Sequence, residues 1–161
     1  MNDFLMSYLP STWVADLMTK PFYSWPACES LHFVGLCLLI GCVGTLDLRM
    51  LGVAKGLPLG VVHRFVKWGI LGFAINLVTG LLFFTSKPGL YLSNVAFAWK
   101  MGLIGVGGLN ALTFYASGLG RRIAVLGPGE DAPLGAKIIA ATSLIVWFSV
   151  MTLGRLLPYL A

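Results

Sequence analysis

Glu29 and His32 are ionisable residues at the start of an apolar stretch, CESLHFVGLCLLIGCVGTLDLR (28–49). Their spacing of three places them on one face of an α-helix, and Cys28 and His32, spaced by four, share the adjacent face. A charged group inside a bilayer costs about 2.5–3.5 kcal/mol on insertion scales, so such groups usually face a partner or a cavity. This face is therefore a candidate binding site.

One imidazole with sulfur ligands is a donor set typical of metal and haem sites. Copper(I) prefers soft sulfur ligands, and haem iron accepts mixed imidazole and sulfur ligands. The residues that fit such a site at one membrane depth are His32, Cys28, Met101 and Met151. His63 falls more than ~20 Å away at ~1.5 Å per residue, so one iron cannot bind both histidines. The alternative is that the two methionines are ordinary apolar residues.

Lys100 adds a second candidate, a cofactor-binding cluster of Glu29, His32 and Lys100. Lys100 stands directly before an uncharged run of 20 residues (101–120) and is expected at the same depth as the other two. The alternative is interfacial anchoring, with Glu29 in solvent and the Lys100 ammonium reaching the headgroups by snorkelling.

Asp47 and Arg49 stand at the other end of the first apolar stretch. Acidic and basic groups at membrane depth commonly pair with one another. We therefore expect a structural ion pair between Asp47 and Arg49, Arg64 or Arg121, which would fix a helical hairpin.

Polar and small residues inside the apolar runs predict how the helices pack. Asn76 and Asn110 are expected to form interhelical hydrogen bonds, worth roughly 0.6–1.7 kcal/mol each. Glycines let a neighbouring backbone approach closely, and the run 101–120 contains Gly102, Gly105, Gly107 and Gly108. We expect this helix to pack centrally.

The composition predicts an all-α integral membrane protein. Of 161 residues, 58% are hydrophobic and 11% charged, and the mean hydropathy is +0.88, outside the range of soluble domains. The net charge of +5 is not gathered with aromatic residues in a nucleic-acid motif, so no nucleic-acid partner is expected. Four uncharged runs predict a four-helix bundle with spans at about 29–50, 62–85, 95–119 and 136–156.

The basic residues predict the orientation. The segments between spans one and two and between spans three and four hold most of the Lys and Arg, which favours a cytoplasmic location for both and a periplasmic location for both termini. Residues 1–27 are rich in aromatic residues and Pro and form a predicted periplasmic, interfacial segment before a four-helix domain at 28–161. Within that segment, 11–19 suits a surface helix capped by Ser11 or Thr12.

The two basic loops resemble each other. LGVAKGLPLG (51–60) and LGPGEDAPLG (126–135) share LG and PLG at the same spacing before a helix, where Pro58 and Pro133 suit the first turn. One interpretation is two duplicated helical hairpins. The other is chance, because Gly, Leu and Pro are common in this chain.

Three stretches carry a family resemblance: SLHFVGLCLLIG (30–41), HRFVKWGILGFAINLVTGLLFF (63–84) and FAWKMGLIGVGGLNALTFY (97–115). Over about residues 29–155 they resemble small four-helix bacterial inner-membrane proteins of uncharacterised function and, more distantly, the copper-resistance D-type membrane domain. That wider group has a first-helix His and a third-helix Lys, which match His32 and Lys100, and the resemblance implies copper handling in some branches. The J-type membrane protoporphyrinogen oxidases are similar in architecture and bind haem b, but have a His about where Asn110 stands here.

These observations predict a multi-pass protein of the bacterial inner membrane. It would bind a cofactor, a metal (copper or haem b) or a partner protein near the periplasmic face, in redox or copper-related physiology. No nucleophile triad, phosphate loop or pair of catalytic carboxylates favours an enzyme. One alternative is a structural or interaction subunit with a periplasmic or membrane protein partner; another is a small transporter that acts as a homo-oligomer.

Overall fold

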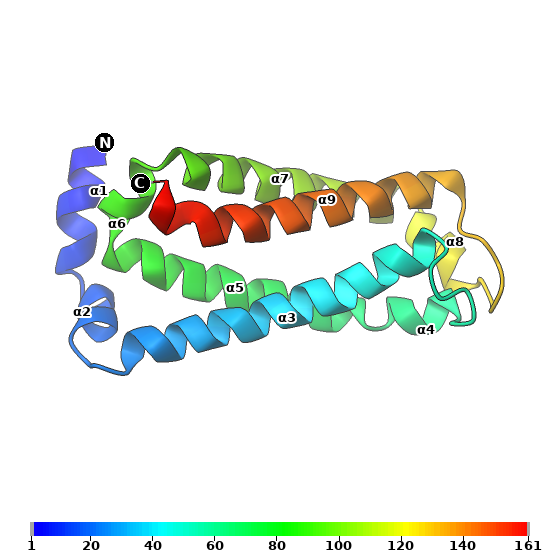
Figure 1. The fold of residues 1–161 in the computed structure, drawn as a ribbon, viewed down its shortest axis with the longest axis horizontal. Coiled ribbons are helices and arrows are strands. Elements are labelled where there is room, and N and C mark those ends of the chain that lie inside the picture. The colour runs from blue at the N-terminus through cyan, green and yellow to red at the C-terminus, as the bar shows by residue number, and fades with distance from the viewer. Residues whose placement is uncertain (1, 161) are drawn as a thin grey trace.

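A computed structural model describes the backbone of residues 2–160 and the side chains of residues 4–160. Four long helices run along the molecule (Figure 1): α3 (Ser24–Met50), α5 (Val66–Ser86), α7 (Val95–Ala116) and α9 (Leu134–Leu156). One end, here called the terminal end, carries α1 (Asn2–Tyr8), η1 (Leu9–Ser11), α2 (Trp13–Thr19), α6 (Pro88–Leu92) and η2 (Leu157–Tyr159). The opposite end, here called the loop end, carries α4 (Leu59–His63) and α8 (Leu119–Ala124).

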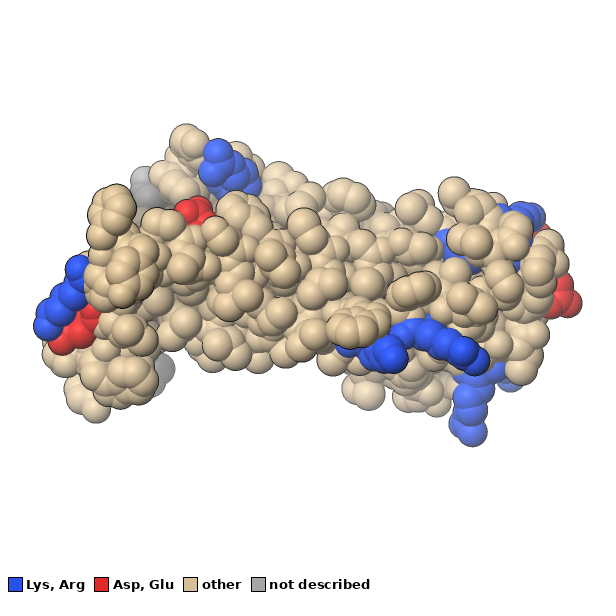
Figure 2. Space-filling view, turned by 90° about the horizontal axis from the view of Figure 1, so that it is seen from below, with Lys and Arg blue, Asp and Glu red and all other residues tan. Residues whose placement is uncertain are grey.

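The predicted all-α membrane bundle is confirmed. Four segments are long and apolar enough to cross a bilayer: Ser24–Met50, Leu59–Ser86, Val95–Ala116 and Leu134–Tyr159. The space-filling view agrees, because the charged side chains gather toward the two ends and leave an uncharged belt between them on the visible face (Figure 2). The chain is therefore a multi-pass membrane protein.

The first span begins five residues earlier than predicted. Pro26 lies in the first turn of α3, where a backbone N–H has no helical acceptor, so the proline does not delay the helix. The predicted surface helix before it is also present as α2. Its cap is Thr12, whose Oγ1 accepts a hydrogen bond from the Ala15 amide at 3.4 Å.

Helices α3 and α5 approach most closely through glycines. A Cβ atom added at Gly72 would lie 2.5 Å from the Gly35 carbonyl oxygen and 2.7 Å from the Leu39 amide nitrogen. A Cβ added at Gly69 would lie 2.8 Å from the Val43 side chain. Helices α3 and α5 therefore form one packed pair, and α7 and α9 form the second.

The prediction that the third span packs centrally is wrong. Helix α7 is the least buried of the four spans and packs mainly on α9. Gly107 meets the side chains of Trp147 and Val146, whereas Cβ atoms at Gly102, Gly105 and Gly108 would meet no atom within 4 Å. Glycine content thus indicates that close approach is sterically allowed, but the arrangement of the other helices decides which glycines are used.

The predicted ion pair of Asp47 is also wrong. Among residues 4–160 the ion pairs are Lys20–Asp16, Lys55–Asp131 and Lys137–Asp131. Asp47 and Arg49 are two positions apart, so the helix directs their side chains to different faces. The buried Asp47 carboxyl lies beside the Ser143 hydroxyl of α9 instead.

Arg49 forms hydrogen bonds with both of the loops at the loop end. Its side chain is 1% exposed, and its Nε donates to the Leu57 carbonyl at 2.6 Å. Its Nη2 donates to the carbonyls of Glu130 at 3.2 Å and Gly127 at 3.4 Å. One guanidinium therefore ties the loop after α3 to the loop before α9.

The two similar loops also pair directly. The Leu59 amide donates to the Leu126 carbonyl at 3.2 Å, and the Gly129 amide donates to the Lys55 carbonyl at 2.8 Å. Pro58 and Pro133 hold equivalent positions as the N-cap residues of α4 and α9, one position before the first turn that the sequence suggested. A duplicated hairpin stays a hypothesis.

Asp131 is predicted to make the stability of the loop end depend on pH. Its carboxylate accepts hydrogen bonds from the Nζ atoms of Lys55 at 3.0 Å and Lys137 at 3.3 Å, and these lower the pKa of Asp131 below the ordinary 3.8. A lowered folded-state pKa means that this contribution to stability is fully present above about 3.8 and is lost as the pH falls through the folded-state value. We expect Asp131→Asn to lower the thermal midpoint in detergent at pH 7.

The control is to measure the thermal midpoints of wild type and Asp131→Asn over a series of pH values. The difference in midpoint between wild type and Asp131→Asn should be constant from pH 7 to about pH 5 and should shrink as the pH falls below 3.8 toward the lowered folded-state pKa. Because the carboxylate is exposed, high salt should also shrink it. A difference that grows on acidification contradicts this role of Asp131.

Candidate ligand site at the terminal end

The centre of the site is a contact between His32 of α3 and Thr79 of α5. His32 Nδ1 lies 2.6 Å from Thr79 Oγ1, and Thr79 is 1% exposed. The two side chains meet because Gly35, one turn beyond His32, lets α5 approach α3. The close contact of the two spans therefore positions the imidazole.

The hydrogen bonds of Thr79 favour one tautomer of a neutral His32. A threonine hydroxyl has one proton, and Thr79 Oγ1 donates it to the Ile75 carbonyl at 2.7 Å. With that proton on the Ile75 carbonyl, the oxygen accepts from the imidazole, and the tautomer that suits this contact has its proton on Nδ1 and its lone pair on Nε2. Metal-binding histidines are commonly held in this way by a second hydrogen bond at the other ring nitrogen.

Aromatic rings hold the imidazole from the side. The His32 ring meets Phe83 edge-on with centroids 5.7 Å apart, and Phe83 packs on Trp25 at 5.0 Å. The Lys87 ammonium lies over the Trp25 ring, 4.8 Å from its centroid. This stack crosses from α5 to the start of α3 and limits the motion of the His32 ring.

Lys100 brings a positive charge to the same region. It is half-buried on α7, and its ammonium lies within electrostatic range of the His32 imidazole. Its Nζ packs against α9, where a Cβ at Gly154 would lie only 3.2 Å away. Within residues 4–160, Lys100 has no ion pair.

Of the other predicted ligands, only Cys28 contacts the same residue as His32. The Cys28 Sγ lies 3.9 Å from the Thr79 carbonyl, so Cys28 and His32 meet the same residue. Glu29 is exposed, and so are Met101 and Met151. In the described part of the chain, no three His, Cys, Asp or Glu residues are grouped as metal ligands.

The buried amides do not all behave as predicted. Asn110 Nδ2 donates to the Ile139 carbonyl of α9 at 3.1 Å, so this interhelical bond is confirmed. Asn76 lies against Gly35, but neither polar atom of its buried amide has a hydrogen-bond partner, so the predicted bond is wrong. Asn94, which the sequence did not single out for packing, caps α7 through Ala96 N and donates to the Leu157 carbonyl at 2.9 Å.

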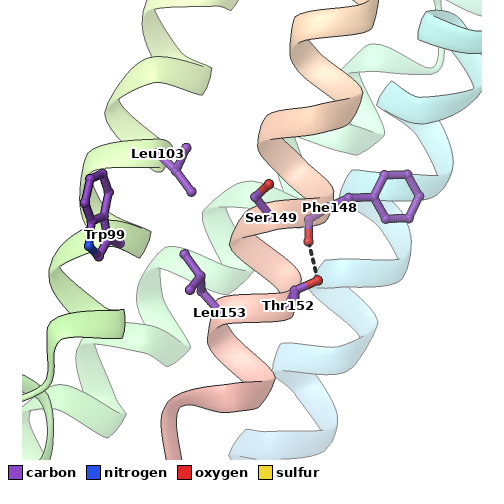
Figure 3. A pocket seen from close by; sticks show the side chains of 6 residues that line it. All are labelled: Trp99, Leu103, Phe148, Ser149, Thr152 and Leu153. Atoms are coloured by element: carbon purple, nitrogen blue, oxygen red, sulfur yellow. Dashed lines mark hydrogen bonds between the residues drawn. The ribbon is translucent and has the colours of Figure 1, made fainter. Parts of the chain in front are cut away.

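A shallow groove lies elsewhere, between α7 and α9 (Figure 3). Its volume is about 480 Å³, and it is lined by Trp99, Leu103, Phe148, Ser149, Thr152 and Leu153. The Thr152 hydroxyl donates to the Phe148 carbonyl at 2.9 Å, so its proton is already used. This mostly apolar groove contains neither His32 nor Lys100.

Sequence reasoning missed the role of Thr79 in this site. A threonine inside an apolar helix usually bonds the carbonyl four residues earlier, as Thr79 does, and nothing local reveals a second partner. Only the pairing of α3 with α5 brings it to His32.

The fold defines the class of the protein as an all-helical, multi-pass membrane protein. The chain belongs to DUF6644, a family of unknown function, whose model matches residues 9–160. No curated protein and no solved structure matches it.

Proposed function

We propose that this protein binds one cofactor at the terminal end of the bundle through His32 and Lys100, as a membrane component of redox or copper-related physiology. The observation that carries the proposal is the 2.6 Å contact between His32 Nδ1 and Thr79 Oγ1, because the tautomer that it favours offers a neutral Nε2 as a ligand. Lys100 would bind a negatively charged group of the same molecule. The basic loop end supports a cytoplasmic location for that end and a periplasmic location for the site.

The donor set fits a cofactor that carries its own negative charge better than a bare copper ion. Copper(I) would need soft ligands around it, whereas the two methionines are exposed and the Lys100 charge repels a cation. Haem b offers an iron for Nε2 of His32 and a propionate for Lys100. When bound, haem would supply one-electron redox chemistry; the chain's own residues would bind and orient it.

The test is a titration of the purified full-length protein in mild detergent with haemin, followed by oxidised and reduced absorption spectra. We expect saturable binding that His32→Ala abolishes. Thr79→Val keeps the side-chain volume but removes the hydroxyl, and should weaken binding about 10–100-fold, as for other partners of ligating histidines. His63→Ala, which alters the histidine beside Tyr115 at the loop end, is the matched control and should bind as wild type does.

The same preparation distinguishes the competing functions. Iron, copper and zinc are measured in protein purified directly from membranes. A colourless, metal-free protein whose haemin titration is unchanged by His32→Ala sinks the cofactor proposal and favours an interaction subunit. Equal losses in His32→Ala and His63→Ala would show that haemin binds non-specifically.

A further inference from the structure

Four basic residues lie on or directly after the short helices of the loop end and are here called the α4–α8 patch: Arg64 caps α4, Lys67 lies in the first turn of α5, and Arg121 and Arg122 belong to α8. The two short helices are packed together, because the Ala124 carbonyl leaves no room for a Cβ at Gly60. Their inner faces belong to the buried core through Leu59, Val62 and Ile123. The four basic residues are exposed on the remaining surface.

No carboxylate in the described chain neutralises this patch. Three acidic residues belong to the loop end, and each has another partner. Asp47 is buried beside Ser143, Glu130 accepts a hydrogen bond from the Gly127 amide at 2.6 Å, and Asp131 binds Lys55 and Lys137. Lys and Arg side chains project from this end of the molecule, next to the uncharged belt (Figure 2).

Large apolar side chains are exposed among these cations. Val61, Phe65 and Trp68 follow the same α4–α5 segment as Arg64 and Lys67, and Val125 follows α8. The Lys67 ammonium lies 5.8 Å from the centre of the Trp68 ring. Basic residues interleaved with exposed apolar ones are typical of segments that lie at a membrane surface.

We infer that the α4–α8 patch binds the phosphate groups of anionic phospholipids in the adjacent leaflet. The cations would bind the phosphates, and Phe65, Trp68 and Val125 would contact the upper acyl chains. A soluble phosphate would satisfy only the cations and leave the apolar side chains in water. This combination therefore favours a lipid over a free anion, and it is independent of any cofactor at the other end.

The experiment measures binding of a fluorescent phosphatidylglycerol to the full-length protein in mild detergent. The test variant is Arg121→Gln/Arg122→Gln. The control variant is Lys55→Gln/Lys137→Gln, which removes the same charge from the same end but from cations already paired with Asp131. At about 1 kcal/mol per basic residue, the test variant should bind about 10- to 30-fold more weakly, whereas the control should change less than about threefold.

Three further measurements complete the test. Fluorescent phosphatidylcholine should bind wild type weakly, and added glycerol phosphate should not displace phosphatidylglycerol. Thermal midpoints without lipid show whether either variant is misfolded; if the test variant is, Arg64→Gln/Lys67→Gln replaces it. Equal binding of both lipids, equal losses in test and control variants, or displacement by glycerol phosphate each overturns the proposal.

Discussion

Replacing Arg49 by Met is expected to destabilise the protein by about 3 kcal/mol and to separate its two loop-end loops. The substitution removes the donors for the carbonyls of Leu57, Gly127 and Glu130 while it keeps an apolar side chain of similar length. Hydrogen bonds to a charged group are worth about 1.5–3 kcal/mol, and carbonyls left unpaired in this part-buried region add a further penalty. Thermal unfolding in detergent should show a lower midpoint, and amide exchange should accelerate in residues 51–58 and 125–133.

Arg121→Met is the matched control for this prediction. Arg121 is exposed on α8 and has no ion pair within residues 4–160, so its replacement in lipid-free detergent should change stability by less than about 0.5 kcal/mol. An Arg49→Met protein with wild-type midpoint and exchange rates would show that Arg49 is not what holds the loops together.

Adding a single methyl group at Gly72 is expected to have the second large effect. In Gly72→Ala the new Cβ would lie 2.5 Å from the Gly35 carbonyl oxygen, and backbone atoms of α3 cannot rotate away as a side chain can. The two helices must move apart, at a cost of about 1–3 kcal/mol. Because the α3–α5 contact also joins His32 to Thr79, haemin binding should weaken with the thermal midpoint.

Gly80→Ala is the control on the same helix. A Cβ at Gly80 would meet no atom within 4 Å, so this substitution should leave stability unchanged or raise it by about 0.5–1 kcal/mol through helix propensity. The two substitutions add the same methyl group to the same helix and differ only in what that group meets, so a Gly72→Ala protein as stable as Gly80→Ala would refute the close contact.

The four spans were predictable because hydropathy and length are properties of each segment alone. The uncharged runs locate the helices to within a few residues, and Thr12 and Asn94 act as caps through amides two or three positions away. Local rules failed where the partner belongs to another part of the fold. Arg49 was expected to find a carboxylate, but its long side chain reaches loop carbonyls that only the folded loop end brings together.

The candidate site was likewise predictable from the sequence only in part. The sequence by itself determined that the chain crosses a membrane and that Glu29 and His32 begin one helix, because apolar length and helical spacing do not depend on neighbours. Only the tertiary structure decided which polar residues meet: the approach of α5 through Gly72 joins Thr79 to His32 and leaves Glu29 exposed. Helix pairing is set by shape complementarity over whole surfaces, and no short stretch of residues contains that information.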